Sequence, residues 1–203
     1  TGVVDGHAFS SARLSSVTRS RTLGVASATV NVSGDLNTAQ ADPDDALHAA
    51  LTYERSFDIG GGSAPDGVQV TTTLGALPSG VSELYEILPI WDHVYEQLPD
   101  GSGTDCMGDV SASHSMVTVE FKQGATSVVP PDNEAEVSNV TSVVITRFGH
   151  SAVIEFDSPR TVALGVSSCT DYQWSPVTRN LFVRLPATAG TSPSISYTVR
   201  LGS

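Results

Sequence analysis

The feature that most constrains this chain is a two-residue alternation of side-chain character in short runs that end at glycine, proline or asparagine. Along residues 51–59, one face carries an apolar set interrupted only by Arg55, and the other face carries Thr, Glu, Ser and Asp. The run 68–74 repeats the alternation after a connection rich in Gly and Pro. Because alternate side chains of a β-strand point to opposite faces, these runs predict two strands joined as a hairpin. If the apolar face is core, Arg55 needs a carboxylate partner or a cleft.

Similar runs recur along most of the chain. In residues 81–98, helical spacing competes with a strand, but Pro89 argues against one continuous helix, so a strand over 83–90 that bends into 91–96 is favoured. A tight turn at Gly149-His150 is expected between two further strands. The other expected strands are 23–32, 115–123, 141–148, 151–156, 160–166, 179–185 and 194–201. About ten short strands without a long helix predict an all-β fold, an antiparallel β-sandwich or jelly roll.

The domain organisation expected from 203 residues is one β-sandwich domain preceded by an arm. Residues 1–22 are rich in Ser and Arg with few apolar anchors, which predicts an irregular N-terminal arm that can include one edge strand. Residues 23–203 form the predicted sandwich. Arg13, Arg19 and Arg21 of the arm are interpreted as solvated charge or as a contact with acidic loops, with an anion-binding arm as the alternative.

Charge narrows the range of partners. The chain has 10 basic and 22 acidic residues, a formal net charge of -12. An acidic surface repels phosphate backbones and anionic lipid headgroups, so neither nucleic acid nor a membrane surface is an expected partner. No apolar run is long enough to span a bilayer, so no membrane span is expected.

Cys106 and Cys169 are the only cysteines. In an oxidising compartment they are expected to form a disulfide, and two buried free thiols are the alternative. The two cysteines are 63 positions apart (169 − 106), and a bridge that closes a loop of this length stabilises a fold by roughly 4 kcal/mol in the chain-entropy model. The chain also starts at Thr1 without Met, as a mature product would. The expected location is therefore extracellular, either secreted or at the cell surface.

Aromatic residues give the best candidates for a ligand-binding site. On a strand, Trp91, His93 and Tyr95 project from one face together. Such a strip can stack on sugar rings, and a His–Tyr pair can move protons, but both aromatics can equally belong to the core. Trp174, on an expected loop, is a second candidate for a binding platform.

One loop offers oxygen ligands for a metal ion. Asp100, Ser102 and Asp105 are closely spaced, which makes calcium the one cofactor considered. The loop lacks the bidentate glutamate of an EF-hand, so a solvated turn is the alternative reading. No nucleophile elbow, zinc-protease helix or phosphate-binding loop is present, so no catalytic residue is assigned.

Three runs resemble a known family. These are Tyr53–Phe57, Asp66–Thr71 and Glu83–Pro89, whose order is similar to the β-sandwich region of heparinase II/III-type polysaccharide lyases. The resemblance implies a sandwich module. Members of that family also carry a large helical toroid that supplies much of the active site, and this chain has none, so no family catalytic residue is transferred.

Three functions follow from these features. The leading expectation is a secreted, non-catalytic β-sandwich module with a carbohydrate-related binding role, whose partner is a polysaccharide. The alternative is a structural subunit of an extracellular filament, surface layer or virion, which binds other copies of itself and pairs its N-terminal segment with a neighbour's sheet edge. The second alternative is a small polysaccharide lyase, with His93 and Tyr95 as base and acid and Arg55 or Arg147 neutralising a uronate.

Overall fold

A computed structural model describes residues 2–4, 7–38, 51–62, 64–93, 117–131, 134–165 and 177–202. The described residues form twelve β-strands and no helix. The strands are β1 (Gly2–Val4), β2 (His7–Leu23), β3 (Ala28–Thr38), β4 (Thr52–Ile59), β5 (Gly67–Leu74), β6 (Val81–His93), β7 (Val117–Gln123), β8 (Thr126–Val128), β9 (Val137–Arg147), β10 (His150–Leu164), β11 (Val177–Arg184) and β12 (Ser194–Leu201). The predicted all-β, antiparallel fold is confirmed, and closure into a two-layer sandwich stays a prediction.

The chain divides into two compact units. Unit 1 contains residues 1–86, 154–157 and 184–201, and unit 2 contains residues 87–153, 158–183 and 202–203. Strands β6, β10 and β11 contribute residues to both. Each unit is described by itself below.

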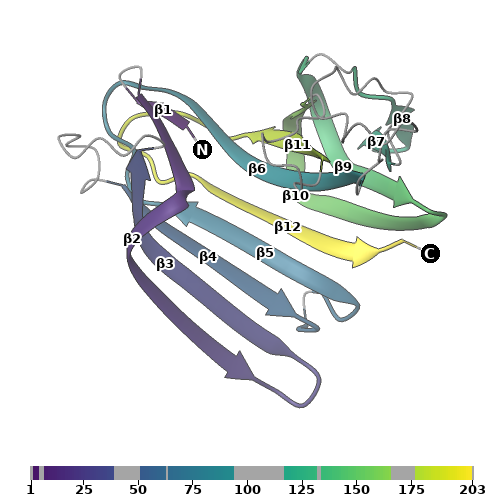
Figure 1. The fold of residues 1–203 in the computed structure, drawn as a ribbon, viewed down its shortest axis with the longest axis horizontal. Helices are drawn as coiled ribbons and strands as arrows, with labels where there is room; N and C mark the ends of the chain where they lie inside the picture. Colours follow the sequence, from purple (N-terminus) through teal and green to yellow (C-terminus); the bar gives the residue numbers. More distant parts are fainter. Residues whose placement is uncertain are drawn as a thin grey trace, which may run out of the picture. The chain divides into compact units, whose positions relative to one another are not determined.

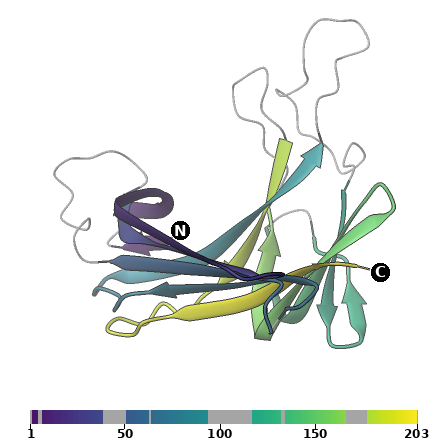
Figure 2. The same cartoon turned by 90° about the horizontal axis from the view of Figure 1, so that it is seen from below.

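Unit 1 is built on long antiparallel strands in the order β6-β1-β2-β3-β4-β5-β12. Strands β2 to β5 and β12 run side by side, with the β2–β3 hairpin at the outside (Figure 1). Figure 2 shows these strands nearly edge-on, as a layer that runs from purple through blue to yellow. Its buried apolar side chains come from several strands and include Tyr53, Val70, Leu74, Ile195 and Tyr197 of β4, β5 and β12, together with Val4 and Leu84.

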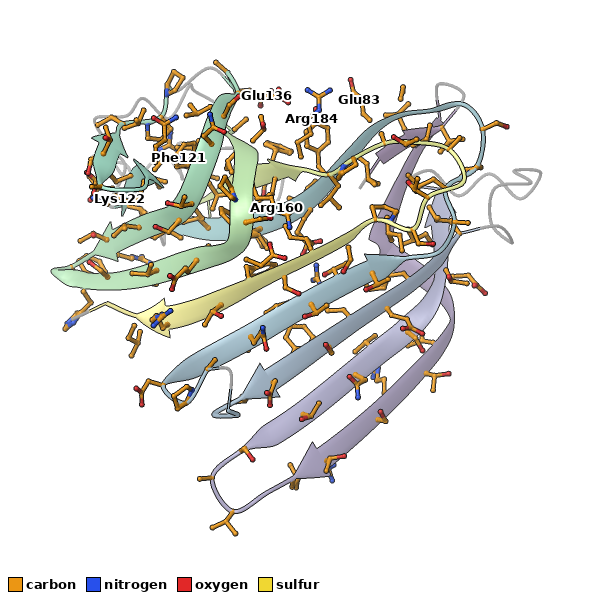
Figure 3. All side chains as sticks on the ribbon, turned by 180° about the vertical axis from the view of Figure 1, so that it is seen from behind. Glu83, Phe121, Lys122, Glu136, Arg160 and Arg184 are labelled. Carbon is orange, nitrogen blue, oxygen red and sulfur yellow. The ribbon has the colours of Figure 1, made fainter. Side chains whose placement is uncertain are left out.

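Unit 2 is a smaller antiparallel assembly. Strands β10, β9, β7 and β8 are neighbours in that order, and β11 pairs with β10. Phe121 and Lys122 follow each other on β7 and show the expected alternation (Figure 3). Phe121 is completely buried, whereas the Lys122 ammonium lies at the surface, 2.7 Å from the Glu120 carboxylate. The other buried apolar side chains of unit 2 are Ile90, Val117, Val119, Val140, Val143, Val162, Ala163, Leu164, Leu181 and Val183.

The N-terminal segment differs most from the sequence expectation. Residues 1–22 were expected to be largely irregular, but β1 and β2 occupy nearly all of them. Strand β2 has no apolar alternation that would mark it as a strand, because it is exposed from Val17 onward. Hydrogen bonding to β3, rather than burial, holds it in place.

Two boundaries in unit 2 also differ. The turn between β9 and β10 is Phe148-Gly149, one residue earlier than expected, and both residues have positive φ (50° and 77°). Such angles match the primed turns that suit twisted hairpins. The runs 151–156 and 160–166 were expected as separate strands, but β10 continues through Pro159. Pro159 and its two preceding neighbours are exposed, where a missing backbone donor is tolerated.

Candidate functional site

The strand register of unit 1 separates its side chains onto two faces. Residues directly opposite each other on antiparallel strands point to the same side. One row across the sheet contains, from β12 to β2, Tyr197, Val70, Phe57, Val30 and Arg21. We call this side the inner face. Burial along the row falls from buried on β12 and β5, through half-buried on β4 and β3, to exposed on β2.

The opposite side of the same five strands carries only polar side chains over the matching rows. We call it the hydroxyl face, because most of its residues are serine or threonine. None of them is buried, and neighbouring hydroxyls bond across strands, as in Thr71 with Ser196 at 2.8 Å. The members are Thr18, Ser20, Thr22, Thr29, Asn31, Ser33, Glu54, Ser56, Asp58, Gln69, Thr71, Thr73, Ser194, Ser196 and Thr198.

A polar cluster lies on the inner face, formed by Arg55 of β4, Thr72 of β5, Glu86 of β6 and Tyr197 of β12. The Arg55 guanidinium donates through Nη2 to Glu86 Oε1 and through Nε to Thr72 Oγ1, the latter over 3.0 Å. The Tyr197 hydroxyl donates to the same Glu86 oxygen over 3.2 Å. In the strand order, β1, β2 and β3 separate β6 from β4. These side-chain contacts therefore hold β6 across the inner face of the sheet.

The polar cluster is closed to solvent on its carboxylate side. Glu86 and Tyr197 are each only 5% exposed, and the Arg55 side chain is 22% exposed. Burial, followed by the negative charge of Glu86, raises the pKa of the Tyr197 hydroxyl far above its usual 10.0. Phe156 packs edge-on against the Tyr197 ring at 6.4 Å between centroids. A hydroxyl that holds its proton this firmly, beside a carboxylate that is almost fully buried, fits a structural role.

The expectation that Arg55 needs a carboxylate partner is confirmed, and the partner is Glu86. The guanidinium also lies over the Tyr53 ring, 5.6 Å from its centroid. Because these contacts are all made inside the protein, Arg55 has a structural role. It is poorly placed to neutralise a bound uronate, the role that the lyase alternative gave it.

The feature of unit 1 most open to a partner is the outer side of β2. Strand β1 pairs only with His7 to Phe9, so among the described residues the segment 18–23 of β2 has a neighbour, β3, on one side only. We call the free side of residues 18–23 the open edge. The Gly24 N–H donates to the Ser27 carbonyl over 2.7 Å and closes the hairpin.

That closing bond fixes the direction of the backbone groups along the open edge. Antiparallel pairs alternate between hydrogen-bonded and non-hydrogen-bonded. Counting back from Gly24, residues Thr18, Ser20 and Thr22 bond to β3 through their backbone. The N–H and C=O groups of Arg19, Arg21 and Leu23 therefore point away from β3, into the open edge.

The end of the β2–β3 hairpin is also apolar. Leu23 is 68% exposed and Val25 is fully exposed. Ile59, another exposed apolar residue, lies two strands from Leu23 at the same end of the sheet, because both Leu23 and Ile59 pair with Ala28. We call these three residues the apolar tip. Exposed apolar groups next to unpaired backbone groups are typical of surfaces that bind another chain.

Most of the predicted site residues fall outside the described residues. Trp91 and His93 belong to β6, two positions apart, which confirms the strand over the helix. Tyr95, Trp174, the calcium-loop residues Asp100, Ser102 and Asp105, and the cysteines Cys106 and Cys169 lie outside the described residues, so those assignments stay predictions. Within the described part of the chain, no group of three or more His, Cys, Asp or Glu side chains is placed to hold a metal ion.

Phe148 is an exposed aromatic residue that is not among the predicted site residues. It lies in the β9–β10 turn, is 72% exposed, and has the Arg147 guanidinium 4.9 Å from its ring centroid. The signal was available, because an aromatic residue before Gly in a predicted tight turn is exposed by its position. The open edge was missed for a different reason, since the polar run 18–22 was interpreted as part of an irregular arm.

Comparison with known proteins assigns no family. No protein-family model matches the chain, and no curated protein shows significant similarity to it. The resemblance to polysaccharide lyases therefore stays a prediction that rests on three short runs. No helix in the described ranges is long and apolar enough to cross a membrane.

Proposed function

We propose that the chain is a non-catalytic structural subunit that assembles with other copies of itself by strand addition at β2. The observation that carries the proposal is the open edge. Among the described residues, no strand lies beside the outward-pointing backbone groups of Arg19, Arg21 and Leu23, and Leu23 also belongs to the apolar tip. An exposed strand of this kind is a template for an added strand, and main-chain hydrogen bonds supply the affinity.

The polar cluster supports the same role. It ties β4, β5, β6 and β12 together from the inner face, so the sheet that presents β2 is braced internally. An internal brace keeps an edge in the extended conformation that an added strand needs. The proposal places the assembly outside the cell, and its support is the expected pairing of Cys106 with Cys169.

Mass measurement on two matched variants tests strand addition. Arg21→Ala and Arg21→Pro both remove the charge, but only proline also removes the N–H that points into the open edge. Light scattering across a concentration series should show assembly of the wild-type chain, weaker assembly of Arg21→Ala, and a monomer for Arg21→Pro. Circular dichroism shows whether each variant is folded. A wild-type chain that stays monomeric at every concentration would refute the proposal.

The hydroxyl face supports a second role, contact with a polysaccharide. Each hydroxyl can both donate and accept hydrogen bonds, as sugar hydroxyls do, and the array is regular, with every member exposed or half-buried. The face offers no aromatic ring for stacking, which places this role second. Co-sedimentation with insoluble glycans tests it, with Thr71→Val and Ser196→Ala as variants of this face.

Trp91→Ala and Trp174→Ala test the aromatic site in the same assay, and full retention of those two variants would exclude that site.

A further inference from the structure

The open edge carries positive charge on an otherwise acidic chain. Arg19 and Arg21 are both exposed and lie two positions apart on the inner face, about 7 Å from each other along the strand. The chain as a whole has 22 acidic and 10 basic residues. Each copy therefore brings many carboxylates and only a small basic strip at the edge where a strand can be added.

Two-fold symmetric pairing of two open edges is disfavoured by this charge. If two β2 strands paired about Ser20, Arg19 of each copy would lie directly opposite Arg21 of the other. Centring the pair on any other residue from 18 to 22 leaves identical arginines opposite or diagonal to each other. Like charges directly opposite each other are destabilising, and diagonal neighbours are still within reach of side chains as long as arginine.

We infer that the open edge receives an acidic extended segment of a second copy, in a head-to-tail contact. This inference rests on the proposed strand addition. Arg19 and Arg21 of one copy meet carboxylates of the next, while the apolar tip covers apolar atoms at the end of the added strand. The two surfaces in contact are different, so each bound copy leaves its own open edge free. Repetition of such a contact builds a ring or an open filament.

The charge of Arg19 and Arg21 also determines which added strands the open edge favours. A bare edge accepts almost any extended chain, whereas charged side chains on an edge exclude strands that carry the same charge. Two arginines on alternate positions favour a segment with carboxylates at the matching spacing. A strongly acidic chain offers such segments, and a second β2 does not.

The test uses the full chain and the double variant Arg19→Glu with Arg21→Glu, which keeps every backbone N–H of the open edge. Arg19→Gln with Arg21→Gln serves as the uncharged control. Wild-type assemblies should weaken roughly tenfold as salt rises from about 0.05 M to about 0.5 M, because exposed ion pairs are screened. The Glu variant should be monomeric where the wild type assembles, and the Gln control should lie between them with little salt dependence.

Mixing the two chains separates the possible contacts. A head-to-tail contact predicts that a small fraction of the Glu variant shortens wild-type assemblies, because a variant copy can bind an open edge but cannot accept the next copy. A symmetric contact predicts instead a stable one-to-one dimer of the two chains, and that result would overturn the inference. Equal assembly of wild type and Glu variant at all salt concentrations would also overturn it while leaving strand addition intact. A wild-type chain that is monomeric at every concentration would contradict both strand addition at β2 and the head-to-tail contact.

Discussion

The Arg55 guanidinium on β4 donates to the Glu86 carboxylate on β6 across the inner face of unit 1, and Tyr197 on β12 donates to the same oxygen. One carboxylate thus joins three strands that are not all neighbours in the sheet. Breaking a buried ion pair by removing one partner is strongly destabilising, whereas replacing both partners with apolar groups can be nearly neutral.

A double-mutant cycle at this pair should therefore be strongly non-additive. Arg55→Met is expected to lower the free energy of unfolding by about 3 kcal/mol or more, because it leaves the Glu86 carboxylate buried without its cation. Glu86→Met should lower it less, since the Arg55 side chain is 22% exposed and can still reach water. The double variant should be more stable than Arg55→Met alone. Urea denaturation of the four proteins measures the cycle, and additive losses would show that the pair is not coupled.

Tyr197 should make the protein sensitive to alkali. Its pKa is raised above the usual 10.0 by burial first, so above about pH 10 the unfolded chain releases a proton that the folded chain retains. Stability is then fully present below pH 10 and falls as the pH rises beyond it, by up to about 1.4 kcal/mol per pH unit.

Tyr197→Phe isolates this effect. At neutral pH the variant should lose about 1 kcal/mol, the net value of one hydrogen bond. Its stability should then fall less steeply than that of the wild type above pH 10. Urea midpoints measured from neutral to alkaline pH give both slopes. Identical slopes for the two proteins would mean that Tyr197 ionises equally in the folded and unfolded states.

The β9–β10 turn should be most stable with glycine at its second position. Gly149 has a φ of 77° with open space around an added Cβ, so Gly149→Ala is opposed by backbone conformation alone. We expect a loss of about 1 kcal/mol. Gly62→Ala is the matched control, because Gly62 also has open space around an added Cβ but no positive φ. Equal thermal stability of the two variants would contradict this account of the turn.

The expected disulfide gives a simple chemical test. If Cys106 and Cys169 pair, the unreduced chain should react with no thiol reagent, and reduction should lower the free energy of unfolding by up to roughly 4 kcal/mol. Mass spectrometry after alkylation, with and without a reductant, reads the pairing directly. Two alkylated thiols in the unreduced protein would remove the support for an extracellular location.

The strands predicted best from the sequence are those whose two faces differ in burial. The runs 51–59, 68–74 and 194–201 reproduce β4, β5 and β12 almost residue for residue, because one face of each packs into the core and the other is the hydroxyl face. Pro89 correctly excluded a helix through β6. Strand β2 could not be recognised in this way, since both of its faces are exposed beyond Val17.

The candidate site also has features that the sequence predicted and features that it could not predict. A lone Arg55 on an apolar face correctly predicted a buried carboxylate partner. Its identity as Glu86 could not be predicted, because the two residues meet through the tertiary fold rather than through strand pairing. The open edge depends on where β1 stops pairing with β2, and no residue type in the sequence marks that point.

Amide hydrogen exchange along β2 tests the central claim most directly. In the monomer, the Ser20 and Thr22 amides should be protected by β3, and the Arg19, Arg21 and Leu23 amides should exchange freely, because their N–H groups point into the open edge. At concentrations where the chain assembles, exchange at Arg19, Arg21 and Leu23 should slow by at least about tenfold while Ser20 and Thr22 change little. Assembly that leaves these three amides unprotected would contradict strand addition at β2.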